Sequence, residues 1–187
     1  MKHLHIAPGM EINTEFKSDR LQFRPIKVSD WQAMQTALHC EKFPRQLPLA
    51  RLKTKAQIIA WHESRVKDWE SGSCYVWSIR HKYTQLVIGQ LSLSRRGAGF
   101  ALAYWIDPLY WGAGLATEAC QALIHQLKAT GFQNLLWAGT QPWNSASGAV
   151  LKKLGFQFTV QIAHELANDR IERINEYQLD FSLKPPL

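Results

Sequence analysis

A pair of glycines followed at once by a helical pattern is the stretch of this sequence best suited to bind an anion. Gly112 and Gly114 precede residues 115–128, in which apolar side chains recur at steps of four along one stripe. Glycine has no Cβ, so its backbone can take positive φ and a ligand can approach its amide closely. The first N–H groups of a helix lack intrahelical partners and carry partial positive charge. The pattern therefore predicts a pyrophosphate site, although a tight strand-to-helix connection without a ligand would need the same glycines.

The turn lies inside a strand–helix–strand unit. Residues 100–107 predict a strand that Pro108 ends, and the apolar run within 134–141 predicts a second, central strand. The helix between them is expected to stop before Gly131. Such a unit needs parallel pairing and a right-handed crossover, which places a ligand outside the carboxyl ends of the two strands.

The rest of the chain predicts a single α/β domain with a mixed, mostly antiparallel sheet flanked by helices. Runs bounded by turn residues predict strands, and capped amphipathic runs predict helices. The expected strands are 20–25, 74–80, 86–94, 156–166 and 171–183, and the expected helices are 31–39, 54–69 and 145–154. Residues 1–17 are polar and are expected to form a loose leader, so that the folded domain spans 18–187.

Three motifs give the chain a specific resemblance. They are Tyr-Trp-Ile-Asp-Pro at 104–108, Trp-Gly-x-Gly-Leu-Ala-Thr-Glu-Ala at 111–119 and Asn-x-x-Ser-x-x-Val-Leu-x-Lys-Leu-Gly-Phe at 144–156. In this order and separation they resemble the GNAT acyl-CoA N-acyltransferase superfamily, and within it the branch of ribosomal-protein-alanine N-acetyltransferases. The resemblance extends from about residue 19 to about residue 183. It implies a sheet splayed at the acyl-CoA site, and acetyl transfer from acetyl-CoA to a primary amine by direct attack in a ternary complex.

The resemblance also implies which residues bind the co-substrate acetyl-CoA. Backbone amides of the glycine turn would hold the pyrophosphate, and a backbone N–H at Trp105 or Ile106 would stabilise the tetrahedral oxyanion. The turn residues implied are Trp111, Gly112, Ala113, Gly114, Leu115, Ala116 and Thr117. Trp111 stands where the conventional residue is arginine or glutamine, which removes one side-chain phosphate donor and leaves the amides unchanged.

The second motif supplies the candidate catalytic residue. In the resembled branch, Asn144 matches a contact to the pantetheine arm, and Ser147 matches a hydroxyl that lies near the coenzyme sulfur and protonates the leaving thiolate. Tyr104 is a second candidate acid. On spacing alone, Asn144 would be only a helix cap and Ser147 only a first-turn residue, while Tyr104 would be a packed strand aromatic. The match over the whole motif favours the catalytic interpretation of Ser147.

No obvious base accompanies these residues. The resembled family often carries a glutamate on the strand 100–107, and its position here is Ala101. An α-amino group has a pKa of about 7.7–8.0 and a lysine side chain about 10.4, so an α-amine needs the least help to lose its proton. The missing base therefore favours an N-terminal acceptor. Candidate carboxylates on or beside the final hairpin are Glu165, Glu172 and Glu176.

The acceptor is expected to lie against the loop 40–53. By the resemblance this loop lines the acceptor side, so Glu41, Lys42, Phe43 and Arg45 are candidate contacts, and each would otherwise be a solvent-facing loop residue. The segment 40–55 is basic, which favours a peptide over a cationic small amine. The alternatives are a polyamine or aminoglycoside acetyltransferase, and a non-catalytic acyl-CoA-binding module that has lost the glutamate.

Composition limits the remaining possibilities. The chain has 187 residues and 46% hydrophobic content, which suits one domain. Three separated cysteines and the spacing of seven histidines give no disulfide framework and no metal site. No signal peptide or spanning run is recognisable, so a cytoplasmic monomer or homodimer is expected. The net charge of +7 is scattered, and could serve coenzyme A, proximity to the ribosome, or solubility alone.

Overall fold

The computed structural model describes residues 3–7, 10–166 and 170–183, with side chains for 11–163 and 172–183. At its centre lies a mixed sheet. Its strand order is β3-β4-β5-β6-β7-β8-β10-β9, and of the strands described only β7 and β8 pair in parallel. The strands are β3 (Phe16–Lys17), β4 (Leu21–Pro25), β5 (Cys74–His81), β6 (Val87–Arg96), β7 (Gly99–Ile106), β8 (Leu135–Thr140), β9 (Gln157–Leu166) and β10 (Arg170–Asp180). The predicted α/β class and mostly antiparallel sheet are confirmed.

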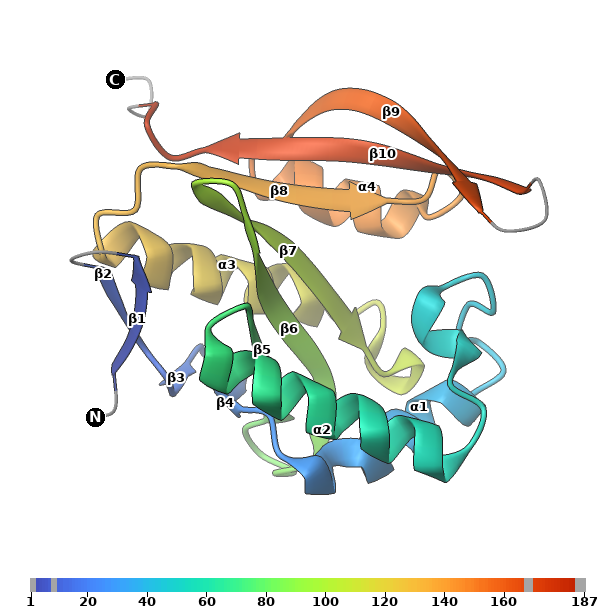
Figure 1. Ribbon diagram of the computed structural model, residues 1–187. Coiled ribbons are helices and arrows are strands. Elements are labelled where there is room, and N and C mark those ends of the chain that lie inside the picture. Colours follow the sequence, from blue (N-terminus) through green and yellow to red (C-terminus); the bar gives the residue numbers. More distant parts are fainter. Residues whose placement is uncertain (1–2, 8–9, 167–169, 184–187) are drawn as a thin grey trace.

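Helices cover both faces of the sheet (Figure 1). One face carries α1 (Trp31–His39) and α2 (Lys55–Ser71), and the other carries α3 (Leu115–Ala129) and α4 (Ser145–Lys153). Within the described residues, three short 3-10 turns complete the fold: η1 (Val28–Asp30), η2 (Pro48–Arg51) and η3 (Pro108–Tyr110). The main core lies between the sheet and α3, where Leu115, Leu123 and Leu127 are fully or almost fully buried.

Local signals explain where the helices begin and end. The Thr54 hydroxyl accepts from the backbone N–H of Gln57, and the Gln57 side chain accepts from the backbone N–H of Thr54, a reciprocal cap that starts α2. Gly72 takes a left-handed conformation with φ 71° and ends it. Asn144 caps α4 by accepting from the N–H of Ser147 at 3.1 Å.

The two parallel strands separate toward their carboxyl ends. Pairing between β7 and β8 covers only Phe100, Ala101 and Leu102, opposite Leu136 to Ala138. Beyond Leu102, β7 continues to Ile106 beside β6 alone, and Figure 1 shows β8 diverging from it. The splay predicted for the acyl-CoA site is therefore present at the end of the sheet where the glycine turn follows β7.

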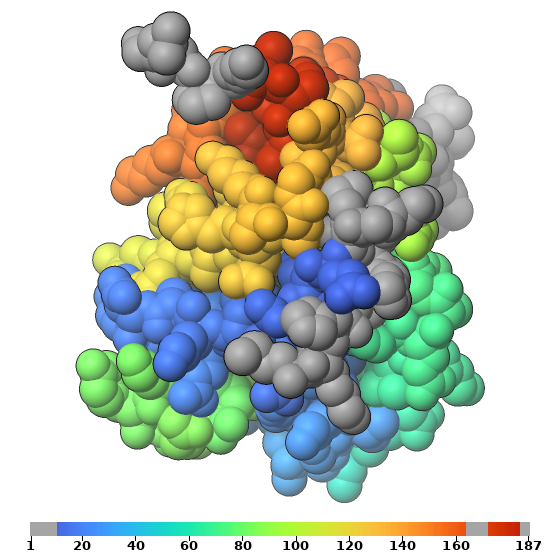
Figure 2. Space-filling model, turned by 90° about the vertical axis from the view of Figure 1, so that its left-hand side faces the viewer, coloured from blue at the N-terminus to red at the C-terminus, as the bar shows by residue number. Residues whose placement is uncertain are grey.

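The N-terminal segment is more ordered than the sequence suggested. Where we expected a loose leader, β1 (His3–Ala7) and β2 (Met10–Asn13) form an antiparallel pair and β3 joins the main sheet. Ile12 is only 1% exposed, and the ring of Phe16 stacks on Phe23 at 4.4 Å between centroids. Figure 2 shows the blue N-terminal residues packed beside the yellow helix α3. These apolar contacts, which form only in the folded chain, order the segment.

The start of β7 approaches β8 so closely that only glycine fits. A Cβ on Gly99 would lie 2.0 Å from the Leu135 carbonyl oxygen and 2.8 Å from the Trp137 ring. We therefore expect Gly99→Ala to lower the free energy of unfolding by about 1–3 kcal/mol, because the two strands must move apart. Chemical denaturation measures the loss. Gly97→Asn is the control, since Gly97 has open space around it, and an equal loss there would contradict the steric explanation.

Candidate functional site

The glycine turn has the conformation that an anion site requires. Gly112 and Gly114 have φ of 81° and 75°, and α3 begins directly after them at Leu115. Before the turn, the Asp107 carboxylate accepts from the N–H of Leu109 at 2.9 Å and fixes η3. The N–H groups of Leu115, Ala116 and Thr117 occupy the first turn of α3, where a helix has no internal acceptor for them. The turn and the helix terminus can therefore donate several backbone hydrogen bonds to one bound anion.

The splay exposes backbone groups of β7. The N–H of Asp107 donates to the carbonyl of Ile88 on β6, and the β6–β7 register is unbroken. Backbone groups alternate in direction along an antiparallel strand, so those of Trp105 also point to β6 while those of Tyr104 and Ile106 point into the splay. This alternation favours Ile106 over Trp105 as the backbone donor to an oxyanion. The indole of Trp111 closes over this point, because its Nε1–H donates to the Ile106 carbonyl at 2.7 Å.

Two predicted catalytic hydroxyls meet at the splay. The hydroxyl oxygens of Tyr104 on β7 and Ser147 on α4 lie 3.0 Å apart. Burial raises the pKa of Tyr104 well above its ordinary value, and its hydrogen bond with Ser147 offsets only part of that rise. Tyr104 therefore stays neutral and can orient the Ser147 hydroxyl. Asn144 lies one turn before Ser147, with its side-chain oxygen occupied in capping the helix.

A buried chain of hydrogen bonds holds the side chain of Trp105 away from the splay. The Trp105 Nε1–H donates to Gln90 Oε1 at 2.9 Å, and Gln90 Nε2 donates to His62 Nε2 at 3.1 Å. The opposite ring nitrogen of His62 lies 2.8 Å from the Ile58 carbonyl, so the neutral tautomer with hydrogen on Nδ1 satisfies every member. Trp105 packs with Met34 and other residues of α1, α2 and the loop between them. No local sequence pattern predicts this series of hydrogen bonds, because its members lie on three separate elements.

Protonation of His62 would break this series of hydrogen bonds. Burial lowers the pKa of His62 below its ordinary value of about 6.5, and the Ile58 carbonyl and the Asp30 carboxylate oppose the shift only in part. The unfolded chain therefore binds a proton that the folded chain does not. The stability that depends on neutral His62 is complete above pH 6.5 and falls as the pH drops below it.

We expect the urea midpoint of the wild type to fall as the pH is lowered from 7 toward 5. His62→Phe, which cannot titrate, should be less stable at pH 7 but should lose less of its stability over the same interval. Parallel pH profiles for the two proteins would contradict the assignment to His62.

One face of the central strands is open. Ala103 on β7 and Gly139 on β8 are exposed, although both strands lie inside the sheet. Ala103 alternates with Tyr104, so it faces the side of α1 and α2. Two carboxylates on β10 border this face: Glu176 pairs with Arg96 at 2.8 Å, and Glu172 accepts from the Gln141 side chain. Both candidate bases are thus engaged, and the side chain of Glu165 lies outside the described residues.

The loop between α1 and α2 divides the expected acceptor contacts into two groups. Phe43 is 2% exposed and packs in the cluster with Trp105, and Arg45 donates to the Leu38 carbonyl at 2.9 Å. These two side chains fix the shape of the loop. Glu41 and Lys42 are exposed and available to a bound molecule, and Arg45 is exposed too, with one guanidinium nitrogen engaged at Leu38.

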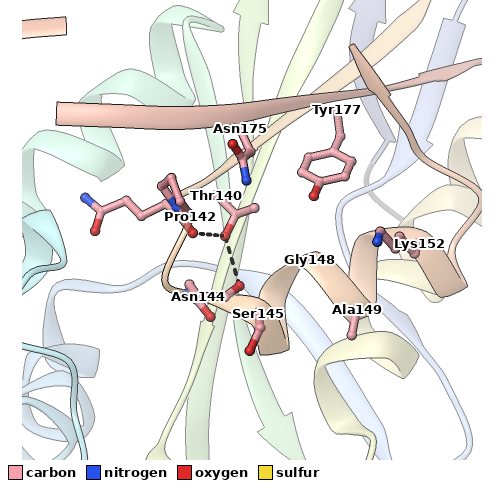
Figure 3. A pocket seen from close by; sticks show the side chains of 10 residues that line it. Thr140, Pro142, Asn144, Ser145, Gly148, Ala149, Lys152, Asn175 and Tyr177 are labelled. Carbon is pink, nitrogen blue, oxygen red and sulfur yellow. Dashed lines mark hydrogen bonds between the residues drawn. The ribbon is translucent and has the colours of Figure 1, made fainter. Parts of the chain in front are cut away.

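A cavity of about 190 Å³ lies between α4 and the middle of β10. Figure 3 shows the Tyr177 hydroxyl pointing from β10 toward Gly148 and Lys152 of α4, with Asn175 and Thr140 beside it. The α4 residues that line the cavity are Ser145, Gly148, Ala149 and Lys152, spaced along one side of the helix. Ser147 points instead to Tyr104, so the cavity and the hydroxyl pair lie on different sides of α4.

The part of the chain that the structure describes shows neither a metal-ion cluster nor a membrane-spanning helix. There, no group of three or more His, Cys, Asp or Glu side chains is placed to hold a metal ion. Within that part of the chain, no helix combines the length and apolar content needed to cross a bilayer.

Solved structures with the same fold cover nearly the whole chain. The RimL ribosomal L7/L12 α-N-protein acetyltransferase in complex with coenzyme A has TM-score 0.76 and 19% identity, covering 91% of this chain and 98% of its own. The ribosomal-protein-S5-alanine acetyltransferase from Vibrio fischeri has TM-score 0.68 and 22% identity, covering 93% and 100%. The microcin C7 self-immunity acetyltransferase MccE, solved with acetyl-CoA and AMP, has TM-score 0.76 and 16% identity, covering 87% and 93%.

Sequence comparison gives the family. No curated protein sequence matches the chain significantly. Residues 20–157, well over half of the chain, match the family described as the acetyltransferase (GNAT) domain. The matched segment contains the splay, the glycine turn, α3 and α4. The chain therefore belongs to the GNAT acetyltransferase family of acetyl-CoA-dependent enzymes.

Proposed function

We propose that this protein transfers the acetyl group of acetyl-CoA to the N-terminal α-amine of a protein. The observation that carries the proposal is the Tyr104–Ser147 hydroxyl pair, at 3.0 Å, beside the splay. In the proposed complex the pantetheine arm lies in the splay next to Asn144, and the diphosphate lies on the glycine turn and the N-terminus of α3. The thioester carbonyl then lies close to the backbone N–H of Ile106.

In the proposed reaction the unprotonated amine attacks the thioester carbonyl carbon directly. A tetrahedral intermediate forms, and the Ile106 N–H stabilises its oxyanion. The carbon–sulfur bond then breaks, and the Ser147 hydroxyl gives its proton to the departing coenzyme A sulfur and takes a proton back from solvent. Tyr104 holds Ser147 in position, and the amine proton passes to solvent.

The open face formed by Ala103 and Gly139 supports an α-amine acceptor. Among its described neighbours, the carboxylates of Glu172 and Glu176 already have partners, and β7 carries Ala101 where the family often has glutamate. A lysine acceptor, with a pKa of about 10.4, would need a free base far more than an α-amine of about 7.7–8.0. Several of the similar structures are described as ribosomal-protein acetyltransferases, including one that modifies an N-terminal serine, which agrees with this choice.

Mass spectrometry of acetyl transfer tests the proposal. The purified protein would receive acetyl-CoA together with peptides that begin with Ala or Ser, N-blocked peptides containing lysine, spermidine and an aminoglycoside. Acetylation confined to free peptide N-termini is the expected result. Acetylation of the small amines instead would identify a small-molecule acetyltransferase, and tight acetyl-CoA binding with no acceptor from a cell lysate would identify a non-catalytic module.

A further inference from the structure

Arg20 contacts the anion-binding turn from a distant part of the sequence. Its Nη1 donates to the carbonyl of Ala113, between the two glycines, at 2.9 Å. Its Nε donates to Glu118 Oε2 at 2.6 Å, and its backbone N–H donates to Glu118 Oε1 at 2.8 Å. The side chain thus bridges the turn and the first turn of α3, 93 to 98 positions away along the chain.

The bond to Ala113 sets which way the turn presents its peptide groups. In a trans peptide the carbonyl of one residue and the N–H of the next point in opposite directions. Because the Ala113 carbonyl is directed at Arg20, the N–H of Gly114 points away from Arg20. Glycine on both sides of Ala113 would otherwise let this peptide rotate and turn an oxygen toward a bound anion.

The same guanidinium neutralises an unfavourable charge. Glu118 lies in the first turn of α3, one turn from the proposed diphosphate. Burial alone would raise its pKa, but hydrogen bonds from Ser18 and Arg20 outweigh burial and hold the pKa below its ordinary value. Glu118 is therefore an anion at neutral pH, and its attraction for Arg20 places the cation beside the turn.

One edge of the guanidinium remains available. Among the described residues Nη2 has no hydrogen-bond partner, and it lies 3.8 Å from where a Cβ on Gly114 would be. The Arg20 side chain is 42% exposed, so a ligand on the turn can reach it. Trp111 supplies neither a cation nor a free donor here, because its indole is neutral and its N–H is bound to the Ile106 carbonyl.

We propose that Arg20 is the diphosphate-recognition residue of this enzyme, replacing the side-chain donor that Trp111 does not supply. It would orient the Ala113–Gly114 peptide and direct Nη2 at a diphosphate oxygen. This inference rests on the proposed placement of coenzyme A on the glycine turn.

The selectivity of the enzyme among acetyl donors tests the proposed role of Arg20. Kinetics would be measured with acetyl-CoA, acetyl-dephospho-CoA and S-acetylpantetheine, which lacks the diphosphate, and binding with CoA and pantetheine. We expect Arg20→Met to lower kcat/KM about 10- to 100-fold for both donors that contain the diphosphate, mainly through KM, and to change it less than about 2-fold for S-acetylpantetheine. Activity on S-acetylpantetheine also shows that the variant is folded.

Arg80→Met is the matched control, because Arg80 also donates from its guanidinium to a turn carbonyl, that of Gln85, but away from α3. It should leave the selectivity between donors unchanged. Equal losses of kcat/KM with all three donors, or no loss with any of them, would overturn the role of Arg20. A loss confined to acetyl-CoA would also overturn it, because it would place the Arg20 contact at the ribose phosphate instead of the diphosphate. Wild-type protein that binds no CoA would instead refute the proposed function itself.

Discussion

Ser147→Ala is expected to lower kcat for acetyl transfer by about 10²- to 10⁴-fold, the range over which a positioned proton donor contributes to catalysis. The change removes the hydroxyl that lies 3.0 Å from Tyr104 and leaves the backbone N–H of residue 147 capped by Asn144. The leaving thiolate then has no donor beside it. Single-turnover kinetics at saturating acetyl-CoA would measure the effect on the chemical step.

Two companion variants separate catalysis from packing. Ser145→Ala changes a hydroxyl on the cavity side of α4 and should keep kcat within about 2-fold. Tyr104→Phe should cost less than Ser147→Ala, because Tyr104 acts through Ser147, and should add little in the double variant. If Ser147→Ala raised KM for acetyl-CoA and left kcat unchanged, Ser147 would be a binding residue only.

The boundaries of α2, α3 and α4 could be predicted because each of these helices carries a strong local signal. Thr54 with Gln57 starts α2, Asn144 starts α4, and glycines at 72 and 114 adjoin helix ends in left-handed conformations. These signals act over three or four residues, which is why one sequence reveals them. The splay could be anticipated only through the family resemblance, since no local pattern says that β8 leaves β7 after Leu102.

The contacts that assemble the candidate site were harder to predict from the sequence. Arg20 alternates in the sequence as an ordinary strand residue, and nothing in its neighbourhood indicates a bond to Ala113. The chain from Trp105 through Gln90 to His62 joins three elements in the same way. The order of the N-terminal segment has a related cause: its strands are short, and Ile12 is buried only against the finished core.

A second large effect concerns stability. Asp30 is 5% exposed, and its carboxylate accepts from Arg24 Nη1 at 2.9 Å and Nη2 at 2.7 Å. It also accepts from the Ser78 hydroxyl at 2.5 Å and the Lys27 N–H at 2.9 Å. One carboxylate thus ties β4, β5 and the start of α1 together.

Asp30→Ala is expected to lower the free energy of unfolding by about 3–5 kcal/mol, because it leaves the mostly buried Arg24 guanidinium without its counter-ion. For a chain of 187 residues this is a fall in Tm of roughly 6–20 °C. The control is Asp68→Ala, which breaks the more exposed i,i+3 pair with Arg65 and should cost about 0–1 kcal/mol. Similar losses from the two variants would contradict the special role of Asp30.

The same carboxylate predicts the response of the wild type to acid. Burial alone would raise the pKa of Asp30, but hydrogen bonds from Arg24, Ser78 and Lys27 outweigh it and hold the pKa below the ordinary value. The stabilisation is therefore complete above about pH 4 and is lost as the pH falls further, toward the pKa of the folded state. Asp30→Ala should lose less stability than the wild type over this interval. Since α1 carries Met34 and Leu38 of the cluster around Trp105, unfolding that begins at Asp30 would also release the proposed acceptor side of the site.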